Sequence, residues 1–481
     1  MHPPPPRLTD EQRAILHHRL QPEETVKVLA FAGTGKTTTL LHFARSRPGM
    51  RFLYVAFNRS VQQQAERVFP ENVTCRTVHS LAWNACGRPF QSQLAPRLHV
   101  SQVMRTLRVK DPITARLAIE TLQNFLVSGE GRVHGGHLPG AAHAIYRGKT
   151  LPDFVQMARE LWIRMSDTQS EEIPMLHDGY LKLFQLSEPR LPFDCILLDE
   201  AQDTNPVTAA LLLRQPATCV MVGDPHQAIY QFRGAVDLMT QIATSRTFHL
   251  TGSFRFGSAV AQVASDLLWQ FKGERFRIKG LREGDRLGAV TGVHTVVART
   301  NAGLFDQAVE LPVSQPLGFV GGISGYQFEL LHGTWHLWKG NSRELRDPLL
   351  KSFPSFEELR SYAEHVEDHE WLSRCRIVEK YRAELPGLLE DLKARSEASE
   401  EAQVQLTTAH KAKGLEFAQV RLADDFTPLI KGRKPLGHDD LADEEVNLCY
   451  VAVTRASERL EPNARLNAFL RWRKQRLSGM D

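Results

Sequence analysis

A short glycine-rich stretch, Ala32-Gly33-Thr34-Gly35-Lys36-Thr37, is the first part of the sequence with a recognisable chemistry. It follows an apolar run and opens a segment with helical periodicity. Backbone N–H groups at such a strand-to-helix turn, together with the positive end of the helix, bind phosphate. Lys36 would then neutralise the β- and γ-phosphates, and Thr37 would ligate Mg²⁺. The strict pattern has glycine at position 30, where this sequence has Ala30, and a chance match is the alternative.

Two adjacent acids end a second apolar run, in Leu197-Leu198-Asp199-Glu200-Ala201-Gln202-Asp203. A strand that ends in Asp-Glu supplies a carboxylate ligand for Mg²⁺, here Asp199. Beside it lies a base, here Glu200, that can orient or deprotonate an attacking water. Adjacent acids are also a common signal for the start of a helix. Because the phosphate-binding loop is present as well, the catalytic interpretation is favoured, and the two stretches together predict hydrolysis of Mg-ATP.

The elements that must position these residues alternate between strand-like and helix-like segments, which predicts an α/β fold with a parallel sheet. Ligands bind such sheets at the carboxyl ends of the strands, where both polar clusters lie. A helix is expected at 37–45, and a second sheet is expected to begin near Leu250. The expected strands are 25–31, 51–57, 195–198 and 219–222 in the first sheet, and 291–298, 404–408 and 417–422 in the second.

Two mostly helical and polar stretches interrupt this alternation, at about 86–190 and 326–401. A structureless loop of that length is improbable, so each is interpreted as an inserted subdomain. The predicted organisation is a first sheet domain at 1–85 and 191–249 and a second at 250–325 and 402–481, each with one helical insertion. The length of 481 residues agrees with several domains.

Composition excludes several classes of protein. The chain is 42% hydrophobic and 24% charged, as in ordinary globular proteins. Its net charge of +4 is too small to indicate nucleic-acid binding by itself, and basic clusters at 272–286 and 465–476 can be solvated surface. We find no signal peptide and no run of 18 apolar residues, so no membrane partner is expected. Six cysteines without a CxxC pair argue against a disulfide framework or a zinc site.

A third polar motif, Gly223-Asp224-Pro225-His226-Gln227, follows the run at 219–222 and makes the interpretation more specific. With it, the chain resembles superfamily 1 DNA helicases of the UvrD/Rep type, and most closely the F-box DNA helicase family. Matching stretches extend in order from residue 8 to about 456. They are LTDEQ, AFAGTGKTTTL, LYVAFNRSVQQQAERVFP, TVHSLAW, LLDEAQD, VGDPHQAIYQFRGA, LTGSFRFG, ARTNAGLFDQAV, TTAHKAKGLEF and NLCYVAVTRA.

The resemblance implies two RecA-like motor domains that close over one ATP, and roles for residues at the matching positions. Gln12 would read the adenine edge and Phe254 would stack on the base, while Glu416 would hold the ribose. The γ-phosphate would be reached by Gln227 and, from the second motor domain, by Arg255 and Arg455, for which a surface salt bridge is the alternative. The remaining nucleotide contacts would come from Ala32, Gly33, Thr34, Gly35, Lys36, Thr37 and Thr38.

For DNA, the matching positions combine aromatic rings with polar and basic groups. Aromatic rings stack on bases of any sequence, and the other groups hold phosphates, as a motor indifferent to sequence requires. Core packing is the alternative for Phe57 and Tyr230. Phe232, flanked by polar residues and eight residues past Asp224, is expected to couple the nucleotide to the DNA. The implied DNA-binding residues are Phe57, Thr77, His79, Tyr230, Phe232, Arg299, Asn301, His410 and Lys413.

The resemblance implies an ATP-dependent DNA helicase in repair or recombination. It would move 3′→5′ as a monomer on single-stranded DNA and act on tailed duplexes, using ATP and Mg²⁺. A translocase that strips recombinase filaments with little unwinding is an alternative, as is an ATP-gated DNA-binding subunit of a larger repair complex. A nuclease fusion is disfavoured, because about 25 residues follow the last motif. The expected location is the cytoplasm, at the nucleoid, in a prokaryote and the nucleus in a eukaryote.

Two departures from the family are visible. The motifs begin at residue 8, so the F-box region that recruits ubiquitin-ligase components is not expected, and no ubiquitin-linked function is carried over. After Arg455 the family continues into an apolar strand, whereas this chain has Arg459-Leu460-Glu461-Pro462-Asn463. Because proline cannot donate to a sheet ladder, that strand is expected to be absent, displaced or at an edge.

Overall fold

The computed structural model describes residues 8–148, 150–230, 237–244, 246–365, 368–397, 402–432, 434–437 and 440–479. The chain forms two compact units. The first contains Met1–Ala30 and Gly35–Leu250, and the second contains Phe31–Thr34 and Thr251–Asp481. Within the described ranges, no helix is both long and apolar enough to cross a lipid bilayer. The six cysteines, all within those ranges, are free thiols.

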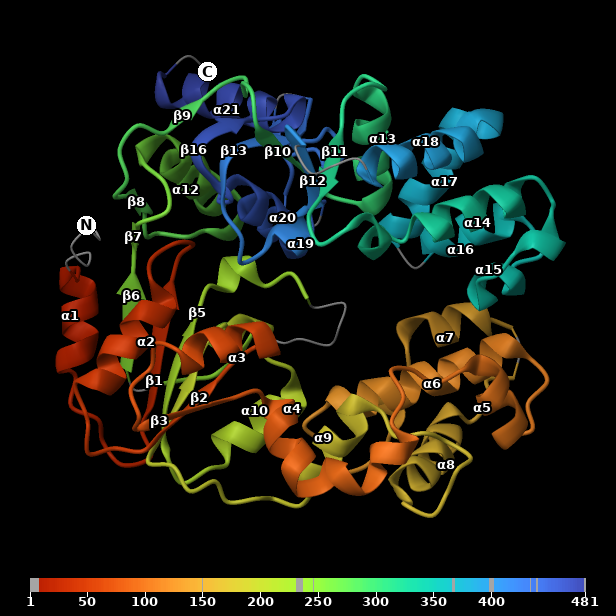
Figure 1. The fold of residues 1–481 in the computed structure, drawn as a ribbon, viewed down its shortest axis with the longest axis horizontal. Helices are drawn as coiled ribbons and strands as arrows, with labels where there is room; N and C mark the ends of the chain where they lie inside the picture. Colours follow the sequence, from red (N-terminus) through yellow and green to blue (C-terminus); the bar gives the residue numbers. More distant parts are fainter. Residues whose placement is uncertain are drawn as a thin grey trace. The chain divides into compact units, whose positions relative to one another are not determined.

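The first unit is built on a parallel sheet that, among the described residues, has six strands in the order β3-β2-β4-β5-β1-β6 (Figure 1). The predicted α/β class is thus confirmed, and the runs expected at 25–31, 51–57, 195–198 and 219–222 are all strands of this sheet. The strands are β1 (Thr25–Ala30), β2 (Phe52–Val55), β3 (Val73–Arg76), β4 (Cys195–Leu198), β5 (Thr218–Gly223) and β6 (Arg246–Leu250).

Both faces of this sheet are buried, which is why its central strands are continuous apolar runs. Side chains alternate between the faces along each strand. In β2, Leu53 and Val55 contribute to one hydrophobic cluster while Phe52 and Tyr54 contribute to the other. The cluster that holds Leu53 continues into the helices between β3 and β4. The sheet and these helices therefore share one core.

The helices of the first unit form two groups. One group lies near the sheet and includes the helix that follows the glycine-rich loop: α1 (Asp10–His17), α2 (Lys36–Arg45), α3 (Arg59–Glu66), α4 (Val78–Ala82), α10 (Pro206–Leu213) and α11 (Leu238–Gln241). The other group lies within the predicted insertion: α5 (Val100–Thr106), α6 (Pro112–Val127), α7 (Gly140–Ile145), α8 (Phe154–Ser166) and α9 (His177–Leu186). Helix α9 packs against α6 of the insertion and α10 of the first group (Figure 1).

The second unit also contains a parallel sheet, whose strands in the described part of the chain follow the order β11-β12-β10-β13-β16-β9. The strands predicted at 291–298, 404–408 and 417–422 are all found here. The bounds are β9 (Arg286–Leu287), β10 (His294–Ala298), β11 (Leu317–Phe319), β12 (Val404–Thr408), β13 (Phe417–Leu422) and β16 (Ala456–Glu461). Two short ribbons accompany it, β7 (Gly252–Ser253) with β8 (Lys279–Gly280) and β14 (Ile430–Lys431) with β15 (Lys434–Pro435).

Helices of the second unit include a cluster between β11 and β12 that shares a core with strands β10 to β12. Its members are α14 (Phe328–Trp338), α15 (Pro348–Ser352), α16 (Phe356–His365), α17 (His369–Tyr381) and α18 (Leu385–Glu397). The other helices are α12 (Ser258–Lys272), α13 (Asn301–Glu310), α19 (Ala409–Ala412), α20 (Asp443–Val453) and α21 (Ala464–Leu477). The exact bounds of the sheet domains and their insertions stay a prediction.

Leu250, near which the second sheet was expected to begin, is the last residue of β6 in the first sheet, and the second unit begins at the next residue, Thr251. One expectation from the sequence is wrong. The strand after Arg455 is neither absent nor at an edge, because β16 pairs with β13 on one side and β9 on the other. Pro462 comes directly after β16, where it removes no ladder hydrogen bond. Asn463 then accepts a hydrogen bond from Leu466 N and caps α21.

Candidate active site

The glycine-rich loop joins β1 to α2 and has the backbone that its sequence predicts. Gly33 and Gly35 have φ angles of 75° and 76°, a left-handed conformation that glycine adopts without steric cost. Gly35 is the N-cap of α2, so unpaired backbone N–H groups of the first helical turn lie beside Lys36. Ala30 is the last residue of β1 and has extended backbone. The absent glycine at position 30 therefore costs the loop nothing.

The acidic pair that follows β4 lies within hydrogen-bond distance of this loop. Lys36 Nζ is 3.0 Å from Glu200 Oε2, and Thr37 Oγ1 donates to Asp199 Oδ2 at 2.7 Å. Glu200 has a left-handed backbone with φ of 51°, which is unusual for a residue other than glycine. Such strained residues are concentrated at functional sites. The fold thus brings together the two motifs from which hydrolysis of a nucleotide was predicted.

Charges buried together determine the ionisation of this cluster. Burial raises the pKa of the Asp199 carboxyl, and the charge of Glu200 raises it further, against the opposing charge of Lys36. Burial alone would lower the pKa of Lys36, but the charges of Glu200, Asp224 and Asp199 outweigh it, so the Lys36 pKa is raised. Lys36 therefore stays cationic. Asp199 and Thr37 offer hard oxygen atoms 2.7 Å apart, a donor pair that suits Mg²⁺.

Tyr54, on β2, is a residue of the site that sequence reasoning missed. Its hydroxyl donates to Asp199 Oδ2 at 2.8 Å, while its ring is buried in the sheet core. Burial, together with the charge of Asp199, raises the pKa of Tyr54, so the hydroxyl remains a donor. Within an apolar strand segment, Tyr54 has no sequence signal that distinguishes it from an ordinary core residue.

A second missed residue, Gln202, connects the acidic pair to the motif that follows β5. Its Nε2 donates to Glu200 Oε2 at 2.5 Å, and its Oε1 accepts from Asp224 N at 3.0 Å. Gln227 in turn donates to Asp224 Oδ2 at 2.6 Å. A Cβ atom at Gly223 would lie 2.5 Å from Gln202 Oε1, so glycine is needed there for this contact. Gln227, predicted to reach the γ-phosphate, is thereby joined to Glu200 by hydrogen bonds.

Gln12, predicted to contact adenine, is buried beside the start of α2. Its Nε2 donates to Thr39 Oγ1 at 3.0 Å, and Thr39 Oγ1 donates to the Gly35 carbonyl at 2.8 Å. Its Oε1 accepts from Thr9 N at 3.0 Å in the cap of α1. Gln12 therefore fixes α1 against the helix that opens at the loop.

In the second unit, the predicted phosphate and ribose residues contact one another. Arg255 Nε is 3.2 Å from Glu416 Oε2, and Arg255 also donates to the Thr454 carbonyl at 3.2 Å. The Glu416 side chain is 62% exposed, and Phe254 is partly exposed beside Arg255 in the chain. Arg455 is not a surface residue. It is fully buried and donates to the carbonyls of Val451 and Leu415 at 2.9 and 3.0 Å.

Two of the predicted DNA-binding aromatic residues of the first unit stack on each other. The rings of Phe57, just past β2, and Tyr230 have centroids 5.9 Å apart and planes 15° from parallel. Phe57 is 50% exposed and Tyr230 is partly buried, so neither is an ordinary core residue. Phe232 lies outside the described residues. Thr77 caps α4 by accepting from Ser80 N at 3.1 Å.

The other predicted DNA-binding residues occupy varied settings. His79 contacts Asp178 Oδ1 at 3.2 Å. Arg299 forms a bidentate pair with Glu445, both side chains being largely buried, so a DNA phosphate would have to replace that carboxylate. Of the remaining three, Asn301 begins α13, His410 lies in α19, and Lys413 is the C-cap of α19.

Comparison with known proteins identifies related sequences. Residues 12–233 match the family model described as an AAA domain, and residues 353–461 match that of the UvrD-like helicase C-terminal domain. "F-box DNA helicase 1" of Gallus gallus is 34% identical over 94% of this chain and 48% of its own length. "F-box DNA helicase protein 1" of Schizosaccharomyces pombe is 33% identical over 94% and 57%. "ATP-dependent DNA helicase UvrD2" of Mycobacterium tuberculosis is 23% identical over 93% and 77%. The chain thus spans about half the length of the F-box relatives.

Replacing Tyr54 with phenylalanine tests its contact with Asp199. The ring and its packing remain, but Asp199 loses a hydrogen bond that orients it. Loss of such an outer partner weakens metal binding by about 10–100-fold. We expect the Mg²⁺ concentration at half-maximal binding of a fluorescent ATP analogue to rise by that factor in Tyr54→Phe. Tyr146→Phe, which removes a hydroxyl contact to Asp111 in the insertion, should leave it unchanged. An unaltered Mg²⁺ midpoint in Tyr54→Phe would remove Tyr54 from the site.

Proposed function

The chain belongs to the UvrD-like helicases, and from that premise we propose that it is an ATP-dependent DNA helicase. One observation carries the proposal: Lys36 and Thr37 of the glycine-rich loop lie within hydrogen-bond distance of Glu200 and Asp199. A lysine, a hydroxyl and two carboxylates at the carboxyl ends of β1 and β4 are the parts that hydrolysis of a nucleotide requires.

The contacts support a division of roles in the first unit. Thr37 and Asp199 would hold Mg²⁺, which supplies charge neutralisation at the phosphates when bound. Lys36 pairs with Glu200 at 3.0 Å, so a phosphate that draws Lys36 away leaves the Glu200 carboxylate to accept a proton from the attacking water. Gln202, bonded to Glu200 at 2.5 Å, would keep that carboxylate oriented throughout.

The family resemblance assigns the remaining nucleotide contacts to residues of the second unit. Arg255 is the stronger candidate for the γ-phosphate, because its carboxylate partner Glu416 is mostly exposed and can exchange for another anion. Glu416 released in this way would be available for the ribose, as the family resemblance implies. Phe254, which is partly exposed, would stack on the base. Arg455 would contact the γ-phosphate from its buried position.

DNA binding is supported by the stacked rings of Phe57, which is 50% exposed, and Tyr230, which is partly buried. Base–aromatic stacking does not depend on sequence, which suits a motor that moves along single-stranded DNA. We further propose 3′→5′ movement and a role in repair or recombination, both from the family resemblance. The proposed substrates are single-stranded DNA and tailed duplexes, and the proposed partners are recombinase filaments or a repair complex.

The function is tested by measuring ATP hydrolysis with and without single-stranded DNA, then strand displacement on duplexes with a 3′ or a 5′ tail. We expect DNA to stimulate hydrolysis and the 3′-tailed duplex to be unwound. Stimulated hydrolysis without displacement, but with clearance of a recombinase filament, would identify a translocase. DNA binding without any turnover would identify an ATP-gated binding subunit. Unwinding of the 5′-tailed duplex alone would reverse the proposed polarity.

Glu200→Gln should abolish turnover while ATP still binds. The amide cannot accept the proton, and removing a positioned base costs about 10²–10⁴ in rate. Thr37 and Asp199 remain to hold Mg²⁺, so nucleotide affinity should change little. Steady-state hydrolysis and equilibrium binding of ATP measure the two effects separately. Glu120→Gln, which disrupts only a surface pair with Arg116, serves as the matched control. A Glu200→Gln enzyme with the rate of the wild type would contradict the assigned base.

Phe57→Ala should weaken binding of single-stranded DNA by about tenfold to a hundredfold, because one base–aromatic stack contributes roughly 1–3 kcal/mol. The dependence of affinity on salt should barely change, since phosphate contacts remain. Phe57→Trp should restore binding, and Phe276→Ala, at another exposed phenylalanine, should have no effect. Fluorescence anisotropy beside thermal unfolding checks this. Normal DNA affinity in a destabilised Phe57→Ala protein would show that the ring serves packing instead.

A further inference from the structure

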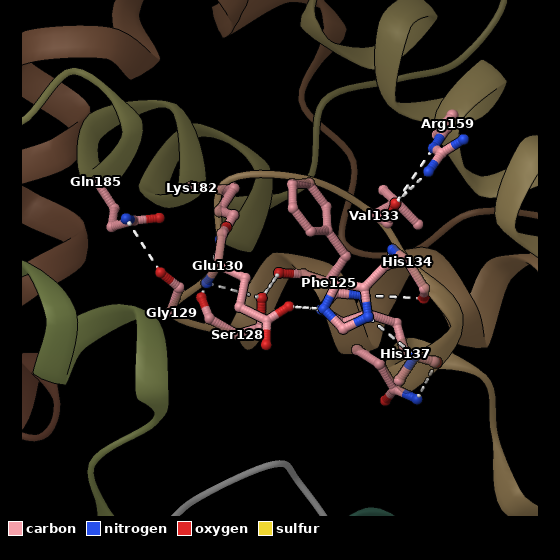
Figure 2. A network of polar contacts seen from close by, with 12 residues as sticks. Phe125, Ser128, Gly129, Glu130, Val133, His134, His137, Arg159, Lys182 and Gln185 are labelled. Atoms are coloured by element: carbon pink, nitrogen blue, oxygen red, sulfur yellow. Dashed lines mark hydrogen bonds and ion pairs between the residues drawn. The ribbon is translucent and has the colours of Figure 1, made fainter.

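The loop that follows α6 carries three side chains, one glutamate and two histidines, of the types that bind metal ions, and they point toward one another. Glu130, His134 and His137 each offer a ligand atom, and these atoms all lie within 4.8 Å of one another (Figure 2). Glu130 Oε2 contacts His134 Nε2 and is 3.4 Å from His137 Nε2. The three residues lie in the helical insertion and have no part in the nucleotide chemistry proposed above.

The backbone of this loop is held by side chains from three helices. Lys182 of α9 is fully buried and donates to the carbonyls of Ser128, at 2.9 Å, and Glu130. Arg159 of α8 donates to the Val133 carbonyl at 2.8 Å, and Asn124 of α6 donates to the His137 carbonyl at 2.9 Å. Figure 2 shows Lys182 and Arg159 beside the loop. The three ligand-type side chains therefore project from a fixed backbone.

The two imidazoles are also positioned. His137 is 5% exposed, and its ring meets Phe125 edge-on, with centroids 5.6 Å apart. The His134 ring folds back over the loop, where a Cβ atom at Gly136 would lie 2.8 Å from its Cε1. The Glu130 and His134 side chains are 52% and 49% exposed, so the cluster has one buried side and one open to solvent. A cation can enter there, and water can complete its coordination.

We propose that Glu130, His134 and His137 bind a divalent transition-metal ion, with zinc as the ion of choice. Two imidazole nitrogens and one carboxylate oxygen, completed by water, form a four-coordinate site that zinc accepts. The cysteine spacing in the sequence argued against a zinc site, but that argument excludes only thiolate ligands. An ion bound to residues 130, 134 and 137 would crosslink three positions of this loop. The proposed role of the ion is therefore to stabilise the helical insertion.

A simpler arrangement competes with metal binding. Gly136 N donates to His134 Nδ1 at 3.0 Å, which places the His134 proton on Nε2 and directs it at Glu130. To bind a metal through Nε2, His134 must move that proton to Nδ1 and give up the Gly136 contact. A hydrogen-bonded Glu–His cluster without metal would stabilise the loop independently of zinc. The response of the protein's thermal stability to zinc therefore distinguishes metal binding from the hydrogen-bonded cluster.

The test uses the full chain without a polyhistidine tag and with its cysteines reduced. After loading with zinc and dialysis against metal-free buffer, we expect about one zinc per chain by elemental analysis. Added zinc should raise the unfolding temperature and a chelator should lower it. Glu130→Gln and His134→Asn, at half-exposed positions, should keep the fold but lose this response and bind zinc at least ~100-fold more weakly. His143→Asn, at an exposed histidine of α7, is the control and should behave as the wild type.

Cobalt provides a second readout that is independent of zinc content. Four-coordinate Co²⁺ absorbs visible light much more strongly than the hydrated ion, so wild-type protein titrated with Co²⁺ should develop bands that both variants lack. Equal zinc in the wild type and the two variants would place the metal elsewhere and overturn the proposal. So would an unfolding temperature that responds to Glu130→Gln but not to zinc or chelator, which is the result expected of the simple hydrogen-bonded cluster.

Discussion

The burial of Asp199 is the constraint on which the candidate site of the first unit depends. A buried carboxylate is costly unless it is hydrogen-bonded and its charge is balanced. Three groups meet this demand: the Thr37 hydroxyl, the Tyr54 hydroxyl and the Glu200 backbone N–H. They come from α2, β2 and the end of β4, so the carboxylate can be accommodated only when the sheet has its parallel register. In β2 and β4 that register pairs Tyr54 with Leu197, two residues before Asp199.

The same network connects the candidate nucleotide site with the stacked rings of Phe57 and Tyr230. Gln202 bonds to Glu200 and to Asp224, and Asp224 bonds to Gln227. Tyr230 follows Gln227 after only two buried residues, and its ring stacks on Phe57. A phosphate that changes the Lys36–Glu200 pair would therefore perturb a segment that ends at the proposed base-stacking surface. This route lies within the first unit.

Features of the site that are contiguous in sequence could be predicted, while those that depend on non-local pairing could not. The loop at 32–37 and the Asp199-Glu200 pair are local motifs, and their apolar strands were correctly placed. Tyr54 and Gln202 matter because of what lies opposite them in the fold, which no local pattern encodes. Strand β6 was not predicted for the same reason, because its parallel pairing with β1 joins segments some 220 residues apart. The expectation for the strand after Arg455 was wrong because Pro462 lies one residue beyond β16 and not within it. Strand ends are harder to predict than the presence of strands.

The arginines of the second unit differ in how readily each can serve a phosphate. Arg455 donates to the carbonyls of Val451 and Leu415 from a fully buried position, so moving it would break both hydrogen bonds of a buried charged group. Arg299 is held by Glu445 in a largely buried pair, and breaking such a pair typically costs about 3–5 kcal/mol. Arg255 is largely buried, but its partner Glu416 is mostly exposed and already solvated, so exchanging this carboxylate for a phosphate oxygen costs less than breaking a pair in which both side chains are buried. The contacts of Arg255 therefore suit the proposed binding and release of a phosphate better than those of Arg455 or Arg299, whose buried partners would have to be given up first.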